Sequence, residues 1–347
     1  MTDAFGRTID YLRLSVTELC NLRCAYCMPP EGICKRSHGE ICSLEELEEL
    51  AAAFVALGVR KIRLTGGEPL VRRGIVRLVE RLAALKAAGL EELTMTTNGT
   101  LLPELAAPQR AAGLDRLNVS QDSLRPERYR ALTRGGELDR VLAGIAAAEA
   151  AGFDRIRLNT VLLKGVNEDE LAELARLARD HPWDIRFIEL MPIGPAAALD
   201  GAFLPAAAVL AAVPELVACS VGRRPLTPPP LPGSGAFACG NGRSDEGIAP
   251  CDGGVARYYS APGWAGRVGL IAPLSACFCE GCTRVRLTAD GKLKPCLHSP
   301  EEFPLRGLRG EALRAAILEA VRQKPARHRL SPSRPSDSAR PMNEIGG

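Results

Sequence analysis

Between Tyr11 and about Leu190, apolar and polar residues follow two recurring patterns, one typical of strands and one typical of helices. Short runs rich in β-branched or alternating apolar residues give way to stretches with helical spacing, an order typical of βα units around a parallel sheet. The runs predicted as strands begin at Tyr11, Lys61, Glu92, Asp115, Arg155 and Asp184. Because about six units are too few to close an eight-strand barrel, right-handed crossovers should curl them into an open one. The predicted fold is α/β, a partial TIM-like barrel.

Two helices between these strands have recognisable starts. Ser43 is followed three residues later by Glu46, which is a capping-box pattern that satisfies two backbone amides at the start of a helix. Asn167 and Glu170 have the same spacing and predict a second helix that runs to Asp180.

After residue 190 the alternation of strand-like and helix-like runs stops, and the rest of the chain falls into two parts. Pro and Gly are frequent from Pro225 onward, so residues 216–254 are predicted as a loop or insertion. A smaller C-terminal α+β cap is predicted from strand-like runs near Arg257, Gly266, Arg284 and Lys292 and a helix from about Gly310 to Arg322. The expected organisation is a barrel over 1–215, the insertion over 216–254 and a C-terminal region over 255–347.

Composition narrows the class of partner. The net charge of +3 is too weak to favour a nucleic-acid surface, so an anionic partner should be small and met by local arginines. No run approaches the roughly 20 apolar residues of a membrane helix, and the start lacks the order of a secretory signal. We therefore expect a cytoplasmic protein without nucleic-acid or membrane partners.

Twelve cysteines are many for such a chain, and in a reducing cytosol they favour metal ligation over disulfides. Cys20, Cys24 and Cys27 follow the first predicted strand, where the loops of a barrel carry active sites. Three thiolates on one short loop suit a four-iron cluster and leave one iron open for another ligand. A zinc site is the alternative, although it would want a fourth ligand.

A second group near the C-terminus has the spacing Cys279-x2-Cys282-x13-Cys296 and again supplies three ligands. Cys277 is an alternative to Cys279, but the C-x2-C pair is the tighter chelate. Arg284 and Arg286 alternate along the strand between these cysteines and so share one face. Two guanidiniums beside a cluster predict recognition of phosphate or a nucleobase.

Polar groups end the other predicted strands and should meet at one rim of the barrel. Gly66, Gly67, Glu68 and Pro69 end the second, where glycines let the backbone approach a ligand closely. The remaining strand ends carry Thr96, Thr97, Asn98, Ser120, Asp122, Lys164 and Met191.

The segment CNLRCAYC, with Tyr26 before its third cysteine, resembles the signature loop of radical S-adenosylmethionine (SAM) enzymes. The resemblance implies that SAM binds the open iron and yields a 5′-deoxyadenosyl radical, with the cofactor carrying the difficult chemistry. It also implies SAM contacts by Tyr26, Gly67, Ser120 and Met191.

Nearly the whole chain resembles the GTP 3′,8-cyclase family of molybdenum cofactor biosynthesis. The likeness lies in LRLSVTELCNLRCAYCMP, KIRLTGGEPLVRR, CEGCTRVRLTADGKLKPCL and the terminal IGG. It implies two [4Fe-4S] clusters, held by Cys20, Cys24 and Cys27 and by Cys279, Cys282 and Cys296. It further implies GTP contacts by Arg13, Arg63, Thr96, Lys164, Arg284, Val285 and Arg286, and catalytic roles for Gly346, Gly347, Arg284 and Arg286.

In that family the radical takes ribose H3′ of GTP, and C3′ then attacks guanine C8. The product is (8S)-3′,8-cyclo-7,8-dihydroguanosine 5′-triphosphate, which a cyclic pyranopterin monophosphate synthase is expected to use. The resemblance also favours a homodimer, while the electron donor is not identified by the sequence. Two alternatives are a radical SAM peptide maturase with an auxiliary cluster and a non-catalytic metal-binding or electron-transfer module.

Overall fold

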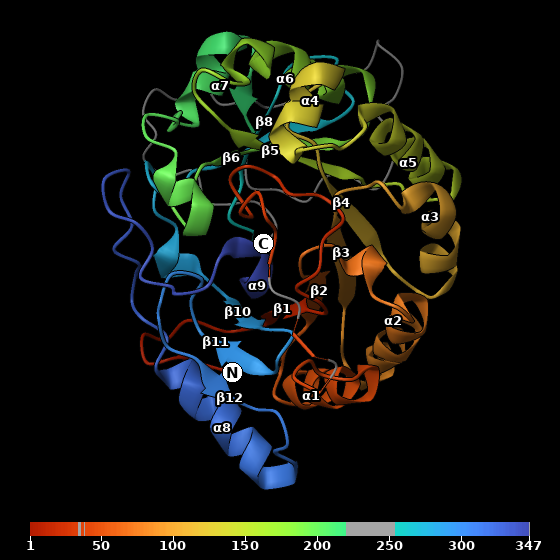
Figure 1. Cartoon of the computed structure of the whole chain (residues 1–347), viewed down its shortest axis with the longest axis vertical. Helices are drawn as coiled ribbons and strands as arrows, with labels where there is room; N and C mark the ends of the chain where they lie inside the picture. The colour runs from red at the N-terminus through yellow and green to blue at the C-terminus, as the bar shows by residue number, and fades with distance from the viewer. Residues whose placement is uncertain (34–35, 38, 220–253, 347) are drawn as a thin grey trace.

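The computed structural model describes residues 1–33, 36–37, 39–219 and 254–346, so most of the predicted 216–254 insertion lies outside the described residues. The six predicted strands are present and pair in parallel in chain order. They are β1 (Tyr11–Ser15), β2 (Lys61–Thr65), β3 (Glu92–Thr97), β4 (Arg116–Ser120), β5 (Arg157–Leu162) and β6 (Asp184–Glu189). They curve into an open arc with helices on its outer side (Figure 1), which confirms the partial barrel.

The C-terminal region extends the same sheet at both ends. β10 pairs in parallel with β1, and β9 pairs in parallel with β6. Antiparallel partners follow, so the described sheet runs β12-β11-β10-β1-β2-β3-β4-β5-β6-β9-β8-β7. The bounds are β7 (Val217–Ala218), β8 (Arg257–Ser260), β9 (Arg267–Ile271), β10 (Arg284–Leu287), β11 (Lys292–Lys294) and β12 (Phe303–Pro304). Arg284 and Arg286 are thereby brought beside the first strand of the barrel.

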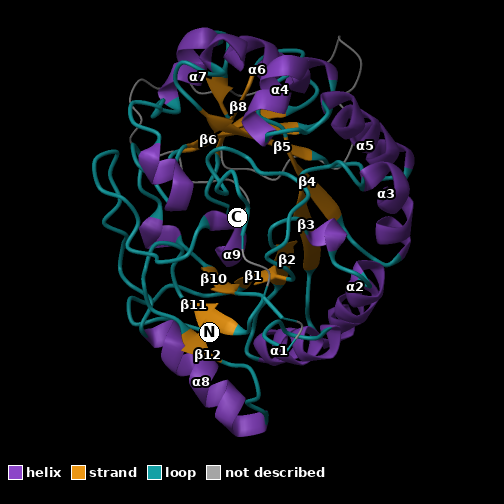
Figure 2. Cartoon of the chain, in the orientation of Figure 1, coloured by secondary structure: helices purple, strands orange, loops and turns teal. Residues whose placement is uncertain are grey.

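Helices cover the outer face of the sheet (Figure 2). A continuous apolar core, which includes the fully buried Leu12, Leu64 and Phe187, lies between the two layers. The helices are α1 (Leu44–Ala56), α2 (Ile75–Ala84), α3 (Leu102–Ala111), α4 (Pro126–Thr133), α5 (Leu138–Ala150), α6 (Leu171–Asp180), α7 (Ala207–Ala212), α8 (Gly310–Arg322) and α9 (Met342–Ile345). In the described part of the chain no helix is long and apolar enough to cross a membrane. The cytoplasmic location stays a prediction.

The two predicted helix starts have different outcomes. The capping box at Ser43 and Glu46 is confirmed, with reciprocal side-chain to backbone hydrogen bonds of 3.1 and 2.7 Å. Helical structure also begins after Asn167, first as a 3-10 turn over Glu168–Glu170 and then as α6, which ends at Asp180 as predicted, but the Asn167 side chain makes no capping hydrogen bond. Asn167 instead donates from Nδ2 to the carbonyls of Asp122 and Val161 at 2.8 and 2.9 Å. Tertiary contacts at the strand ends therefore outweigh the local capping preference.

Candidate active site

A cavity of about 700 Å³ occupies the inside of the arc. Both groups of cysteines contribute to its lining, although they lie more than 250 residues apart in the chain. The predicted site residues that line it are Arg13, Cys20, Cys24, Tyr26, Cys27, Arg63, Gly67, Thr96, Ser120, Met191, Cys279, Cys282, Arg284, Arg286 and Cys296. One cavity therefore brings together most of the site residues that the sequence predicted.

The N-terminal cysteine loop follows β1 and is held from outside by α4. The backbone N–H groups of Arg23 and Ala25 donate to the carbonyls of Thr133 and Leu132, at 3.0 and 2.9 Å. Burial raises the pKa of the Cys20 thiol to about 11. Cationic iron stabilises thiolates that a protein interior would otherwise keep protonated. The three sulfurs on one short, externally braced loop therefore fit an iron-sulfur cluster.

The glycine turn after β2 packs directly on this loop. Gly67 N–H donates to the Thr17 carbonyl at 2.8 Å. A Cβ on Gly66 would lie 2.3 Å from the Thr17 oxygen, and one on Gly67 would lie 2.3 Å from the Leu19 oxygen. The glycines are thus required for the close approach of two backbones, whatever ligand they also contact.

Replacing Gly67 with alanine should lower the free energy of unfolding by about 1–3 kcal/mol, because the new Cβ overpacks against the backbone before Cys20. Chemical denaturation together with iron retention measures the effect. The matched control is Gly39→Ala, since its nearest neighbour is the Ser37 Oγ at 4.0 Å. Equal stability of the two variants would contradict this explanation.

Two buried carboxylates, Glu68 and Asp122, support the rim; the sequence placed both at strand ends but assigned neither a ligand contact. Glu68 accepts from Thr97 Oγ1 at 2.8 Å and from the Asn98 N–H at 2.6 Å, which ties the ends of β2 and β3 together. Burial raises the pKa of Glu68 to about 7. Asp122 accepts from the Tyr26 hydroxyl at 2.6 Å and so orients the aromatic side chain between the cysteines. Their presence at strand ends, in GGEP and SQD, was the available signal.

The second cysteine group has a different electrostatic environment. Burial opposes ionisation of Cys282, but the charges of Arg284 and Lys324 lower the pKa of its thiol to about 6. Cys277 is exposed, and its sulfur lies 3.9 Å from Nε2 of His328. Donor atoms of Cys277, Cys279 and His328 lie within 4.8 Å of one another. The choice between Cys277 and Cys279 as cluster ligand thus stays open on geometry alone.

Two buried cations hold the backbone of this second group, and sequence reasoning missed both. Lys324 Nζ donates to the carbonyls of Arg284 and Pro295 at 2.8 and 2.7 Å. Arg7 Nη1 donates to the Cys279 carbonyl at 2.9 Å. The Lys324 contacts join the two halves of the cysteine group, which the chain separates by a β-hairpin, and Arg7 holds the first half. The sequence offers little signal for them, because lysine and arginine are ordinarily surface residues.

Replacing Lys324 with methionine should destabilise the fold by about 1–3 kcal/mol, because two backbone carbonyls lose their donor. It should also lower the reduction potential of a cluster bound there, since a nearby positive charge is removed. Potentiometric titration followed by electron paramagnetic resonance (EPR) tests this, with Lys324→Arg as the charge-conserving control. A potential that is the same in both variants would count against the electrostatic role.

The predicted arginines form a row across neighbouring strands. Arg13 on β1 pairs in register with Arg286 on β10 and with Arg63 on β2, so parallel pairing directs all three to one face. Burial and the neighbouring Arg284 lower the pKa of Arg286 to about 9, and burial lowers that of Arg63 well below its usual value. Carboxylates that line the same cavity already pair with other arginines, as Asp184 does with Arg157 at 3.0 Å. An anion between the aligned guanidiniums would relieve their repulsion.

The other predicted contacts differ in their placement. Thr96 lines the cavity, and among the described residues its buried hydroxyl has no hydrogen-bond partner, which suits a ligand contact. Lys164 is exposed on the loop after β5 and is not among the lining residues. Val285 is fully buried between the two arginines of β10. Gly347 lies outside the described residues, while the Gly346 carbonyl accepts a hydrogen bond from Arg286.

The chain is similar in sequence to known proteins. Residues 14–178 match the Radical SAM superfamily, and residues 243–330 match Molybdenum Cofactor Synthesis C. A GTP 3′,8-cyclase of Peptoclostridium acidaminophilum is 46% identical, with 100% of this chain and 98% of the relative covered. One from Geobacter sulfurreducens is 45% identical, with 100% and 99% covered. One from Alkaliphilus oremlandii is 42% identical, with 100% of both chains covered.

Among solved structures, Streptococcus suis SuiB bound to S-adenosylmethionine is similar with a TM-score of 0.49 and 17% identity, covering 59% of this chain and 46% of that one. The assignment rests on the sequence relatives instead, because they extend over the full chain at 42–46% identity. On that evidence, the chain belongs to the GTP 3′,8-cyclase family of radical SAM proteins.

Proposed function

We propose that this chain converts GTP to (8S)-3′,8-cyclo-7,8-dihydroguanosine 5′-triphosphate, an early step of molybdenum cofactor biosynthesis. The observation that carries the proposal is the shared cavity, which both cysteine groups and the aligned arginines line. Family membership over the full chain favours this activity over a peptide maturase or a non-catalytic metal-binding module.

Cys20, Cys24 and Cys27 would hold the first [4Fe-4S] cluster, whose open iron suits SAM. When bound, the cluster and SAM would supply the radical chemistry needed to remove ribose H3′ and join C3′ to guanine C8. Tyr26, Gly67, Ser120 and Met191 would contact SAM, and all four line the cavity. Asp122 holds the Tyr26 ring in place through its hydroxyl.

Cys279, Cys282 and Cys296 would hold the second cluster beside the guanine. Arg13, Arg63, Arg284 and Arg286 would bind the triphosphate, because guanidiniums make bidentate, permanently charged contacts with phosphate oxygens. Thr96 would add a hydroxyl contact. The main task of these residues is to keep C3′ and C8 close, since positioning alone can supply much of the rate acceleration. Contacts by Lys164 and Val285 remain predictions.

Gly346 would have its catalytic role next to Arg286, because the Arg286 guanidinium donates a hydrogen bond to the Gly346 carbonyl. A side chain at this position would collide with Thr65, because a Cβ on Gly346 would lie 2.4 Å from its Oγ1. The close contact and the positive φ of 87° at position 346 therefore favour glycine there. A matching role for Gly347, a homodimer and a downstream cyclic pyranopterin monophosphate synthase are further predictions.

Anaerobic turnover of cluster-reconstituted protein with SAM, a reductant and GTP tests the proposal. Mass spectrometry should detect 5′-deoxyadenosine and a cyclised nucleotide triphosphate, both dependent on GTP. If 5′-deoxyadenosine formed without a product from GTP, the chain would still be a radical SAM enzyme, but GTP would not be its substrate. Zinc binding without iron absorbance would favour the non-catalytic module.

A further inference from the structure

The short helix α9 is packed inside the barrel. α9 lies inside the arc of strands (Figure 1), with Asn343 and Ile345 only 1% and 0% exposed. Nδ2 of Asn343 reaches the Glu18 carbonyl at 3.5 Å, and Gly346 meets Arg286. One helical turn is too short to be stable on its own, and chain ends fray unless they are tied down. Something else must therefore hold this tail in place.

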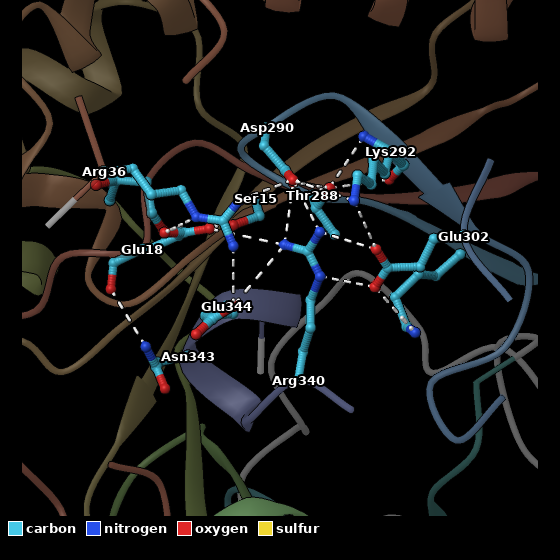
Figure 3. A network of polar contacts seen from close by, with 12 residues as sticks. Ser15, Glu18, Arg36, Thr288, Asp290, Lys292, Glu302, Arg340, Asn343 and Glu344 are labelled. Atoms are coloured by element: carbon cyan, nitrogen blue, oxygen red, sulfur yellow. Dashed lines mark hydrogen bonds and ion pairs between the residues drawn. The ribbon is translucent and has the colours of Figure 1, made fainter. Parts of the chain in front are cut away.

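Arg340 provides one attachment, two residues before α9. Its Nη1 and Nη2 donate to the two carboxylate oxygens of Asp290, at 3.1 and 2.8 Å. Its Nε and Nη2 donate to Glu302 at 2.6 and 2.8 Å (Figure 3). The side chain is only 9% exposed, so these are largely desolvated contacts. One guanidinium thus engages two carboxylates in the fork geometry that lysine cannot reproduce.

Arg36 provides a second attachment from the segment after the N-terminal cysteine loop. Its Nε contacts Glu18 at 2.9 Å, its Nη1 contacts Asp290 at 2.9 Å, and its Nη2 contacts Glu344 on α9 at 3.2 Å. Asp290 is shared by both arginines, as Figure 3 shows. The tail is therefore held at both ends of its short helix.

The network joins the tail to both cysteine groups. Glu18 lies two residues before Cys20, and Asp290 lies in the turn between Arg286 and Cys296. The tail thus contacts the segment just before the first predicted cluster loop, through Asn343 and the Glu18 carbonyl, and an arginine beside the second cysteine group.

We propose that Arg340 is the positioning residue of the C-terminal tail, that Arg36 assists it, and that together they hold Gly346 at Arg286. The proposal rests on the proposed function, because it assumes that Gly346 takes part in GTP turnover. A buried network whose members share partners is lost largely as a unit. Loss of Arg340 should therefore release the whole tail and not a single contact.

The test compares Arg340→Ala and Arg340→Lys with the control Arg334→Ala. Arg334 belongs to the same segment but is half exposed and pairs with Asp337 at 3.7 Å. Hydrogen exchange at the amides of residues 343–346 and kcat for the cyclised nucleotide are measured in full-length, cluster-loaded protein. Arg340→Ala should speed exchange and lower kcat, each by about tenfold or more, because turnover follows the docked fraction of the tail. Arg340→Lys should restore part of both, and the control should match the parent.

Unchanged exchange in Arg340→Ala would overturn the proposal, and so would faster exchange with unchanged kcat. If Arg340→Ala does not fold, Arg36→Ala carries the same test, because its side chain is 30% exposed and its loss is easier to tolerate. Faster exchange at Glu344 is then expected, and unchanged exchange would again contradict the proposal. If the parent protein forms no product from GTP, the proposed function fails, while the exchange data still decide whether the arginines hold the tail.

Discussion

Replacing Arg286 with lysine is expected to lower kcat/KM for GTP by about 10²–10³-fold, the usual cost of removing one well-placed donor from an enclosed site. Arg286 is buried in register with Arg13 and also donates to the Gly346 carbonyl. A lysine keeps the positive charge but lacks the planar guanidinium with its several N–H donors. It therefore cannot donate to a phosphate of GTP and to the Gly346 carbonyl at the same time.

Steady-state kinetics under anaerobic conditions measure this effect. Arg309→Lys is the matched control, since Arg309 is 55% exposed and pairs with Glu49 at 2.8 Å. The variant should retain its iron and still cleave SAM slowly, because the N-terminal cysteines are untouched. If Arg286→Lys had the same kcat/KM as the control, the proposed contact between Arg286 and GTP would be contradicted.

Replacing Cys282 with serine should abolish the cyclised nucleotide while leaving slow formation of 5′-deoxyadenosine. If the chain holds the two cubane clusters proposed above, about four of eight iron atoms should be lost, because the second would no longer assemble. Serine is nearly the same size as cysteine, so the fold should persist. Iron analysis, EPR and product detection on one preparation together measure the three effects.

The pair Cys277→Ser and Cys279→Ser decides the ligand that geometry leaves open. Cys279→Ser should behave like Cys282→Ser, whereas Cys277→Ser should keep the full iron content, because Cys277 is exposed and outside the cavity lining. The reverse result would place Cys277 in the second cluster.

The strands and the cysteine groups could be predicted because each depends on residues close together in sequence. The run from Tyr11 to Ser15 is apolar enough to be a strand by itself, and Cys20, Cys24 and Cys27 are spaced for one cluster without reference to any other segment. Alternation along β10 likewise placed Arg284 and Arg286 on one face.

Those local patterns could not predict which distant segments pair with one another. Nothing local to Arg284 indicates that it lies opposite Tyr11, yet this register aligns Arg286 with Arg13. Lysine and arginine are usually surface residues, so the sequence does not single out Lys324 or Arg340. Only the folded chain buries Lys324 against backbone carbonyls and Arg340 against carboxylates. The missing side-chain cap at Asn167 has the same cause, because its amide is used by neighbouring strand ends.

The most direct test of the central claim uses GTP that carries deuterium at C3′ of the ribose. Single-turnover reaction of cluster-loaded protein with SAM and a reductant should transfer one deuterium to 5′-deoxyadenosine and give an equal amount of cyclised nucleotide that lacks it. Deuterium retained in the nucleotide, or 5′-deoxyadenosine formed without label, would contradict abstraction of H3′ and with it the proposed reaction.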